Sequence, residues 1–270
     1  MFAQPRQPIS IFNSLPPMLI LFASAILPVL IILFAIYRAD KINKEPIGKL
    51  ILVFICGALI AFPAALLESV LDWFEPSGAL LGGLYKGFCV AAFSEELLKL
   101  LVLFLLVWNS RHFDEYFDGI VYAVYVSMGF ACVENILYVF SSDDYGSSLA
   151  TAAMRAILSV PGHFLFAVMM GYYLGLAKFS TNRRGRYLLY AFLVPVFFHG
   201  TFDALLMIPE GMDEGGLKWL VTLALFVVFI LFDIKMWRRG IRRIRHLQQL
   251  SSDQNADKIR NEFEGFQWNF

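Results

Sequence analysis

The stretch PMLILFASAILPVLIILFAIY at residues 17–37 contains no charged residue. A bilayer core of about 30 Å needs about 20 apolar residues in an α-helix, so this stretch is long enough to cross it. Six further stretches are long and apolar enough to do the same: residues 50–70, 80–108, 117–140, 150–177, 187–208 and 217–237. The sequence therefore predicts an all-α, polytopic integral membrane helix bundle with about seven transmembrane helices.

The composition of the whole chain agrees with this class. Of the 270 residues, 59% are hydrophobic and 16% are charged, and the mean hydropathy is +0.64. Soluble domains have about 45–50% apolar and about 25% charged residues, so this chain has too little polar surface to cover a soluble globule. The 22 basic and 22 acidic residues cancel to a net charge of +0, which predicts no nucleic-acid partner. The three cysteines stand apart from one another, which argues against a disulfide framework or a thiolate zinc site.

The charges of the connecting segments alternate along the chain. Lysine and arginine gather in three segments: residues 38–49, 178–186 and 238–245. Three others contain acidic residues but neither lysine nor arginine: residues 71–79, 141–149 and 209–216. Short basic loops stay in the cytoplasm. The pattern predicts that the N-terminus lies outside and the C-terminus inside.

Three parts of the chain follow from this topology. Residues 1–16 form a short extracytoplasmic N-terminus, and residues 17–237 form the transmembrane domain. Residues 238–250 are basic, with apolar residues at helical spacing, which is typical of an amphipathic helix on an anionic membrane surface. Residues 251–270 are polar and of mixed charge, and we expect them to form a flexible cytoplasmic tail.

Ionisable residues inside a transmembrane span indicate a functional site, because each costs about 2.5–3.5 kcal/mol. The third span contains Ser94-Glu95-Glu96-Leu97-Leu98-Lys99. At about 100° per residue, Lys99 lies roughly 40° from Glu95 and roughly 60° from Glu96, on opposite sides. One ammonium is thus placed between two carboxylates. Two adjacent carboxylates cannot both ionise cheaply, so one should stay charged against Lys99 while the other acts as a general base.

The other spans contribute further ionisable residues: Glu68, Glu134, Arg155, His163, His199 and Asp203. His199 and Asp203 are four residues apart and share one helix face, an arrangement that suits a metal ligand with its orienting partner or a polarised acid. Pro161 and Pro195 precede the two histidines and predict kinked or broken helices beside a polar cavity. Arg155 either extends to the outer surface or pairs with a carboxylate.

These residues leave three classes of function open. Buried acids and histidines serve proteases, but they also build the proton relays of transporters and channels. A non-catalytic membrane sensor with a structural polar cluster is the third class. The sequence has no detectable inverted repeat, which disfavours a transporter, and two acids beside one lysine are more than packing requires.

Four motifs, in this order and on successive spans, resemble the PrsW family: Glu95-Glu96-x-x-Lys99, Phe130-x-x-x-Glu134-Asn135, Pro161-x-His163 and His199-x-x-x-Asp203. Asp118-Gly119-Ile120, which opens the fourth span, is also similar to the family. The resemblance covers roughly residues 80–210. PrsW proteins are bacterial polytopic intramembrane proteases, distantly related to the CAAX prenyl proteases. The resemblance implies that residues 17–237 are a transmembrane protease domain with its motif core at about 80–210.

The resemblance also implies roles for the site residues. Glu95 and Glu96 would be the paired catalytic acids with Lys99 as their partner, and His199 the essential histidine with Asp203 behind it. His163 and Glu134 complete the pattern, although Glu134 stands where the CAAX relatives have a histidine.

The resemblance leaves the cofactor open between none and Zn²⁺, because the family is described both as glutamate-dependent and as metal-dependent. A metallo-type enzyme would use His163, His199 and Glu134 as ligands. We favour the metal-independent version, in which a glutamate activates water, because the sequence has no HExxH motif and no single helix presents a ready ligand pair.

Finally, the resemblance implies a biological setting. The PrsW family is associated with the first (site-1) cleavage of a membrane-spanning anti-sigma factor in regulated intramembrane proteolysis, which starts a stress response. The expected partners are therefore a single-span membrane protein such as an anti-sigma factor, and the lipid bilayer. The expected location is the bacterial inner (cytoplasmic) membrane.

Overall fold

The computed structural model describes residues 15–142 and 144–267, and all regular structure within them is helical. The predicted extracytoplasmic N-terminus, residues 1–16, lies outside the described residues except for its last two positions. The elements in chain order are α1 (Leu15–Ala39), α2 (Ile47–Leu59), α3 (Ala61–Asp72), α4 (Ala79–Tyr85), η2 (Lys86–Ala92), α5 (Phe93–Leu106), α6 (Asp118–Phe140), α7 (Tyr145–Met154), η3 (Arg155–Ser159), α8 (Val160–Phe179), α9 (Arg184–Glu210) and α10 (Gly216–Gln267). The two elements labelled η are short π-helical segments.

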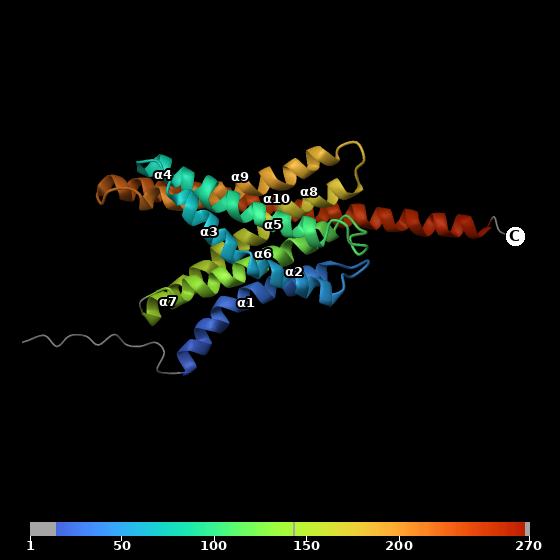
Figure 1. The fold of residues 1–270 in the computed structure, drawn as a ribbon, viewed down its shortest axis with the longest axis horizontal. Coiled ribbons are helices and arrows are strands. Elements are labelled where there is room, and N and C mark those ends of the chain that lie inside the picture. Colours follow the sequence, from blue (N-terminus) through green and yellow to red (C-terminus); the bar gives the residue numbers. More distant parts are fainter. Residues whose placement is uncertain (1–14, 143, 268–270) are drawn as a thin grey trace, which may run out of the picture.

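The helices form the predicted membrane bundle (Figure 1). Within the described residues, six segments are long and apolar enough to cross a bilayer: 17–39, 47–72, 118–140, 145–179, 184–210 and 216–261. The remaining predicted span, 80–108, is the uninterrupted helical rod formed by α4, η2 and α5. It carries three charged residues within five positions, Glu95, Glu96 and Lys99, besides Lys86. The all-α membrane fold predicted from the sequence is confirmed.

Helix α6 lies at the centre of the bundle. In its most apolar stretch 67% of the residues are buried, against 6% in that of α10. Glycines permit its neighbours to approach closely: a Cβ added at Gly129 would collide with the backbone of Phe54 on α2, and one at Gly171 with the backbone of Gly119. The outer helices instead expose large apolar side chains, such as Phe34 on α1 and Leu66 on α3, which suits contact with lipid. The central position of α6 places its polar residues against α8.

The two ends of the bundle differ in their connections. The predicted acidic segments connect α3 to α4, α6 to α7 and α9 to α10, at the left of Figure 1. The predicted basic segments lie at the opposite end, where the C-terminal half of α10 projects beyond the other helices (Figure 1). We refer to these as the acidic end and the basic end.

Helix α10 extends much further than the sequence predicts. A flexible tail is expected from residue 251, but the helix continues to Gln267. Neither proline nor glycine interrupts residues 241–264. One face also packs on the loops of the basic end: Gln248 donates a hydrogen bond to the Ala39 carbonyl at 2.9 Å, and the backbone N–H of Phe117 donates to the Ser251 hydroxyl at 2.9 Å. These tertiary contacts stabilise a helix that the polar composition alone does not predict.

Candidate active site

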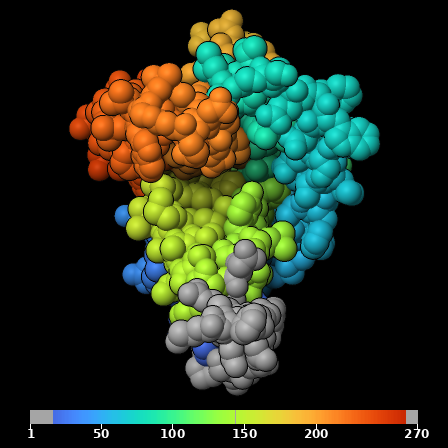
Figure 2. All heavy atoms as spheres, turned by 90° about the vertical axis from the view of Figure 1, so that its left-hand side faces the viewer, coloured from blue at the N-terminus to red at the C-terminus, as the bar shows by residue number. Residues whose placement is uncertain are grey.

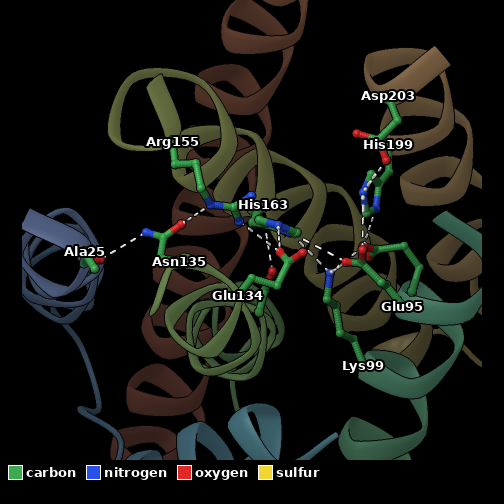
Figure 3. Close-up of polar contacts among 11 residues, drawn as sticks. Ala25, Glu95, Lys99, Glu134, Asn135, Arg155, His163, His199 and Asp203 are labelled. Carbon is green, nitrogen blue, oxygen red and sulfur yellow. Dashed lines mark hydrogen bonds and ion pairs between the residues drawn. The ribbon is translucent and has the colours of Figure 1, made fainter. Parts of the chain in front are cut away.

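Four helices bring the predicted site residues into one connected network (Figure 3). Helix α5 carries Glu95, Glu96 and Lys99. Glu134 lies on α6 and His163 on α8, and α9 carries His199 and Asp203. Residues that are more than a hundred positions apart in the sequence meet here because α5 and α6 both lie against the α8–α9 pair. The network lies inside the bundle, among the membrane-spanning helices.

Lys99 stands at the centre of this network. Its ammonium Nζ lies 2.9 Å from Glu95 Oε2 and 2.8 Å from Glu96 Oε1, so one cation bridges two carboxylates as the helical spacing predicts. The side chain is 1% exposed, and its ammonium also lies 4.4 Å from the centre of the Phe130 ring. A buried charge of this kind is stabilised only by well-placed partners. Lys99 therefore holds both acids in fixed positions.

The protonation of His163 follows from its neighbours. Its Nδ1 lies 3.3 Å from Lys99 Nζ, and an ammonium can only donate, so Nδ1 accepts. Its Nε2 then carries the hydrogen and donates to Glu134 Oε2 at 2.7 Å. His163 is thus a neutral imidazole that connects the Lys99 cluster on α5 with Glu134 on α6.

Arg155 supports Glu134 from the other side. Its Nη2 lies 3.3 Å from Glu134 Oε2, and its Nε donates to Asn135 Oδ1 at 2.7 Å. Asn135 in turn donates to the carbonyl of Ala25 on α1 at 3.0 Å. Of the two alternatives left by the sequence, Arg155 takes the role of a carboxylate partner. Asn135 has no predicted role, although its place next to Glu134 in the motif is a sequence signal that could have identified it.

His199 lies between two acids. Its Nδ1 is 3.0 Å from Glu96 Oε1, and its Nε2 is 3.1 Å from Asp203 Oδ2. Carboxylate oxygens only accept when ionised, so both ring nitrogens are placed to donate and the geometry suits an imidazolium. The ring stacks on Phe166, with centroids 4.5 Å apart and planes inclined by 15°. Phe166 comes from α8, so no local pattern in the sequence reveals this contact.

A cavity of about 840 Å³ lies beside the network, and only one of the two paired acids lines it. Glu95 lines this cavity, whereas Glu96 is 0% exposed and lies behind its wall. Other predicted site residues on the lining are Glu134, His163, His199 and Asp203, together with Glu68. The cavity reaches toward the acidic end, where Lys86 pairs with Glu75 at 3.0 Å. In Figure 2, which faces this end, the surface is recessed between the teal α4 segment, the orange start of α10 and the yellow-green α7.

Two π-helical segments precede site residues. η2 ends three residues before Glu95, and η3 ends four residues before His163. Wider π turns of this kind are frequent at functional sites, because they change the direction of the side chains that follow. The sequence predicts kinked or broken helices at Pro161 and Pro195, but the chain stays helical through both: α9 continues through Pro195, and Pro161 follows η3 within the continuous helical segment 145–179. The local irregularity is thus a wide turn and not a broken helix.

Comparison with known proteins gives the family. The profile of the PrsW family, described as "PrsW family intramembrane metalloprotease", matches residues 45–232. The chain belongs to the PrsW family. It is 37% identical to protease PrsW of Clostridioides difficile over 218 residues, which is 80% of this chain and 88% of that protein. It is 32% identical to protease PrsW of Bacillus subtilis over 235 residues, which is 87% of this chain and 98% of that protein.

Membership in the PrsW family decides between the function classes that the sequence left open. The chain is a multi-pass membrane protein and an intramembrane protease, and the interpretations as a transporter or a non-catalytic sensor no longer apply. A third relative, protease PrsW of Geobacillus kaustophilus, is 32% identical over 242 residues, or 90% of this chain. No solved structure matches the chain significantly.

The description of the PrsW family as metalloproteases raises the question of a zinc site. Two overlapping groups have ligand atoms within 4.8 Å of one another: Glu95, Glu134 and His163, and Glu95, Glu96 and His199. These residue types match zinc. The ligand set predicted from the sequence, His163, His199 and Glu134, is divided between the two groups.

The positions of the side chains, however, do not fit a zinc ion. The Lys99 ammonium already stands between the carboxylates and His163, at 2.8–3.3 Å from all three. A second cation at this point would repel it. Both nitrogens of His163 and Nδ1 of His199 lie at hydrogen-bond distance from other side chains, and Nε2 of His199 lies 3.1 Å from Asp203 Oδ2, so each ring nitrogen already faces a polar partner. In this arrangement Lys99 supplies the positive charge that Glu95 and Glu96 share.

Proposed function

We propose that this protein hydrolyses a peptide bond of a membrane-spanning substrate with a water molecule that Glu95 activates, without a metal ion. The observation that carries the proposal is the different exposure of the paired acids: Glu95 lines the cavity, and Glu96 is enclosed behind it. Only an acid that reaches the cavity can take a proton from water there. Glu95 is therefore the general base, and Glu96 positions Lys99 and His199.

The reacting water has a suitable place between Glu95 and His199. Glu95 Oε1 and His199 Nε2 are 3.9 Å apart, a separation that one water molecule can bridge. As the water oxygen attacks the substrate carbonyl carbon, Glu95 takes one of its protons. The carbonyl oxygen becomes an oxyanion, which the positive charge of the adjacent His199 imidazolium stabilises. Glu95 then returns the proton to the amide nitrogen while the C–N bond breaks.

Other residues support these two groups. Asp203, at 3.1 Å from His199 Nε2, and Glu96, at 3.0 Å from Nδ1, favour the positively charged imidazolium. The hydrogen-bonded residues His163, Glu134 and Arg155 form another part of the cavity lining. Each of these residues acts through its neighbours and so is a positioning residue.

The proposed substrate is a single-span membrane protein such as an anti-sigma factor, cut at site 1 in the bacterial cytoplasmic membrane. The cavity lies among membrane-spanning helices, so a scissile bond must reach it within the bilayer region. Apolar residues on the lining, Val90, Leu158, Phe202 and Leu206, suit the side chains of an apolar segment. The bacterial relatives and the family resemblance support the location and the substrate class.

The proposal predicts substrate cleavage in cells. Wild-type protein co-expressed with a panel of tagged single-span proteins, including anti-sigma factors, should release a fragment from at least one of them. Both His199→Ala and Glu96→Gln should lose the fragment, because the first removes the imidazolium that stabilises the oxyanion and the second removes its orienting acid. Variants should be compared at equal membrane levels. Fragments that persist in both variants would contradict the proposed roles.

The proposal also predicts independence from zinc. Purified protein should contain less than one zinc per chain by elemental analysis. Cleavage should be unchanged by a chelator such as phenanthroline, whose nitrogen donors select zinc over Mg²⁺ and Ca²⁺, in a buffer with millimolar Mg²⁺. One zinc per chain together with inhibition that added zinc reverses would overturn the metal-independent mechanism and leave the protease activity itself intact.

A further inference from the structure

A second group of buried acids lies at the basic end, far along α6 from the active site. Asp40 follows α1, Glu45 precedes α2, Glu115 lies in the loop before α6, and Asp118 opens α6. All four are buried, with exposed fractions between 0% and 7%. Asp118 belongs to the motif Asp118-Gly119-Ile120, which has no role in the proteolytic mechanism.

The oxygens of this group converge. Asp40, Glu115 and Asp118 each offer a carboxylate oxygen within 4.8 Å of the others. Asp118 Oδ2 accepts from the backbone N–H of Glu115 at 2.7 Å and from that of Asp114 at 3.0 Å, which fixes the loop around it. Tyr122, one turn further on α6, donates to Glu45. The backbone and Tyr122 thus orient the carboxylates toward a common point.

Several of these oxygens lack any partner. Asp40 Oδ1, Glu45 Oε1 and Asp118 Oδ1 are fully buried and form no hydrogen bond within the described residues. A buried, unpaired carboxylate oxygen is costly, so such groups in proteins are normally paired or bound to metal. The ion pairs found in the described part of the chain all involve other carboxylates.

Within the described residues, no ion pair neutralises the negative charge of this group. The carboxylates of Asp40, Glu115 and Asp118 lie close enough to repel one another when they are ionised. A positive charge inside the group would remove the repulsion.

There is room for such a charge. The lining of a cavity of about 180 Å³ includes Asp40, Lys41 and Glu115, together with Gln248 and Ser251 of α10. A water molecule takes up about 30 Å³, so the cavity holds a cation with several waters. Carboxylate, amide, hydroxyl and water oxygens are the ligands of hard divalent cations.

We propose that Asp40, Glu115 and Asp118 bind a hard divalent cation, Mg²⁺ or Ca²⁺, which joins α10 to the loops of the basic end. The cation explains why the described chain keeps three converging carboxylates buried beneath α10. It also accounts for the α10 contacts on either side of the cavity, through Gln248 and Ser251. The site is separate from the proteolytic network.

Thermal unfolding of the detergent-purified chain tests this proposal. After EDTA and dialysis, Mg²⁺ or Ca²⁺ at constant ionic strength should raise the wild-type Tm saturably, by about 5–10 °C at a hundredfold excess over Kd. Glu115→Gln should lose most of this shift. Asp114→Asn, a change to an exposed carboxylate in the same loop, should keep it. A wild-type Tm that neither ion changes, or an equal shift in Glu115→Gln, would overturn the proposal.

Terbium binding provides a second measurement that does not depend on the stability of a variant. Tb³⁺ luminescence excited through nearby tyrosines such as Tyr122 should appear with wild-type protein and be displaced by the cation that occupies the site. It should persist in Glu95→Gln and fall strongly in Asp118→Asn. Loss in Glu95→Gln with retention in Asp118→Asn would assign the ion to the active-site acids and refute this site. A different result would refute the cation site: no terbium signal with wild type, and a higher Tm for ion-free Asp118→Asn than for ion-free wild type. It would show that protons, and not a cation, neutralise the group.

Discussion

Replacing Glu95 by Gln is expected to lower the cleavage rate by about 10²–10⁴-fold, the usual contribution of a general base. The amide keeps the size of the side chain and still accepts a hydrogen bond from Lys99 but cannot take a proton from water. The measurement is the rate of fragment formation from a single-span reporter in detergent or liposomes, at equal amounts of folded enzyme.

Two comparisons make this prediction specific to the proposed base. Glu68→Gln changes another acid on the same cavity wall that lies outside the Lys99 network, and it should keep most of the activity. Glu95→Asp withdraws the carboxylate from the water position but retains a base, so its rate should fall between wild type and Glu95→Gln. Cleavage by Glu95→Gln at the wild-type rate would exclude Glu95 as the base.

Replacing Lys99 by Met is expected to cost about 3–5 kcal/mol of folding free energy, because removal of one partner leaves buried charges unpaired. Lys99 is 1% exposed, and its ammonium is the shared partner of Glu95, Glu96 and His163. Activity should be lost together with stability. The free energy of unfolding of the purified variant in mild detergent measures the effect.

A matched control for this variant lies on the same helical rod. Lys86 pairs with Glu75 at the cavity mouth, where both side chains are more than a third exposed, so Lys86→Met should change stability by no more than about 1 kcal/mol. The double variant Lys99→Met with Glu96→Gln should recover part of the lost stability, since it removes an unpaired carboxylate together with the cation. Equal stability of Lys99→Met and wild type would refute the central role of the ammonium.

Some features of the active site could be predicted from the sequence because they lie within one helix. The spacing of three and four residues alone places Lys99 against Glu96 and Glu95, and the spacing of four places His199 against Asp203. The structure has both arrangements. Backbone geometry decides such contacts.

Contacts between helices could not be predicted in this way. The pairing of His163 with Glu134, and the stacking of Phe166 on His199, depend on how α6, α8 and α9 are rotated about their axes. The same holds for the choice between Glu95 and Glu96 as the residue that faces the cavity. Adjacent positions on a helix look equivalent in a sequence, and only the neighbouring helices make one of them accessible.

The apolar runs, by themselves, determined the class of this protein, the approximate limits of its spans and the identity of its costly intramembrane residues. Those properties depend on length and composition, because a span must bury about 20 apolar residues whatever surrounds it. Only the tertiary structure decided that α10 continues through the predicted tail, and that Asp40, Glu115 and Asp118 meet beneath it. These features depend on which surfaces pack together, so the free energy that stabilises them comes from residues distant in the sequence.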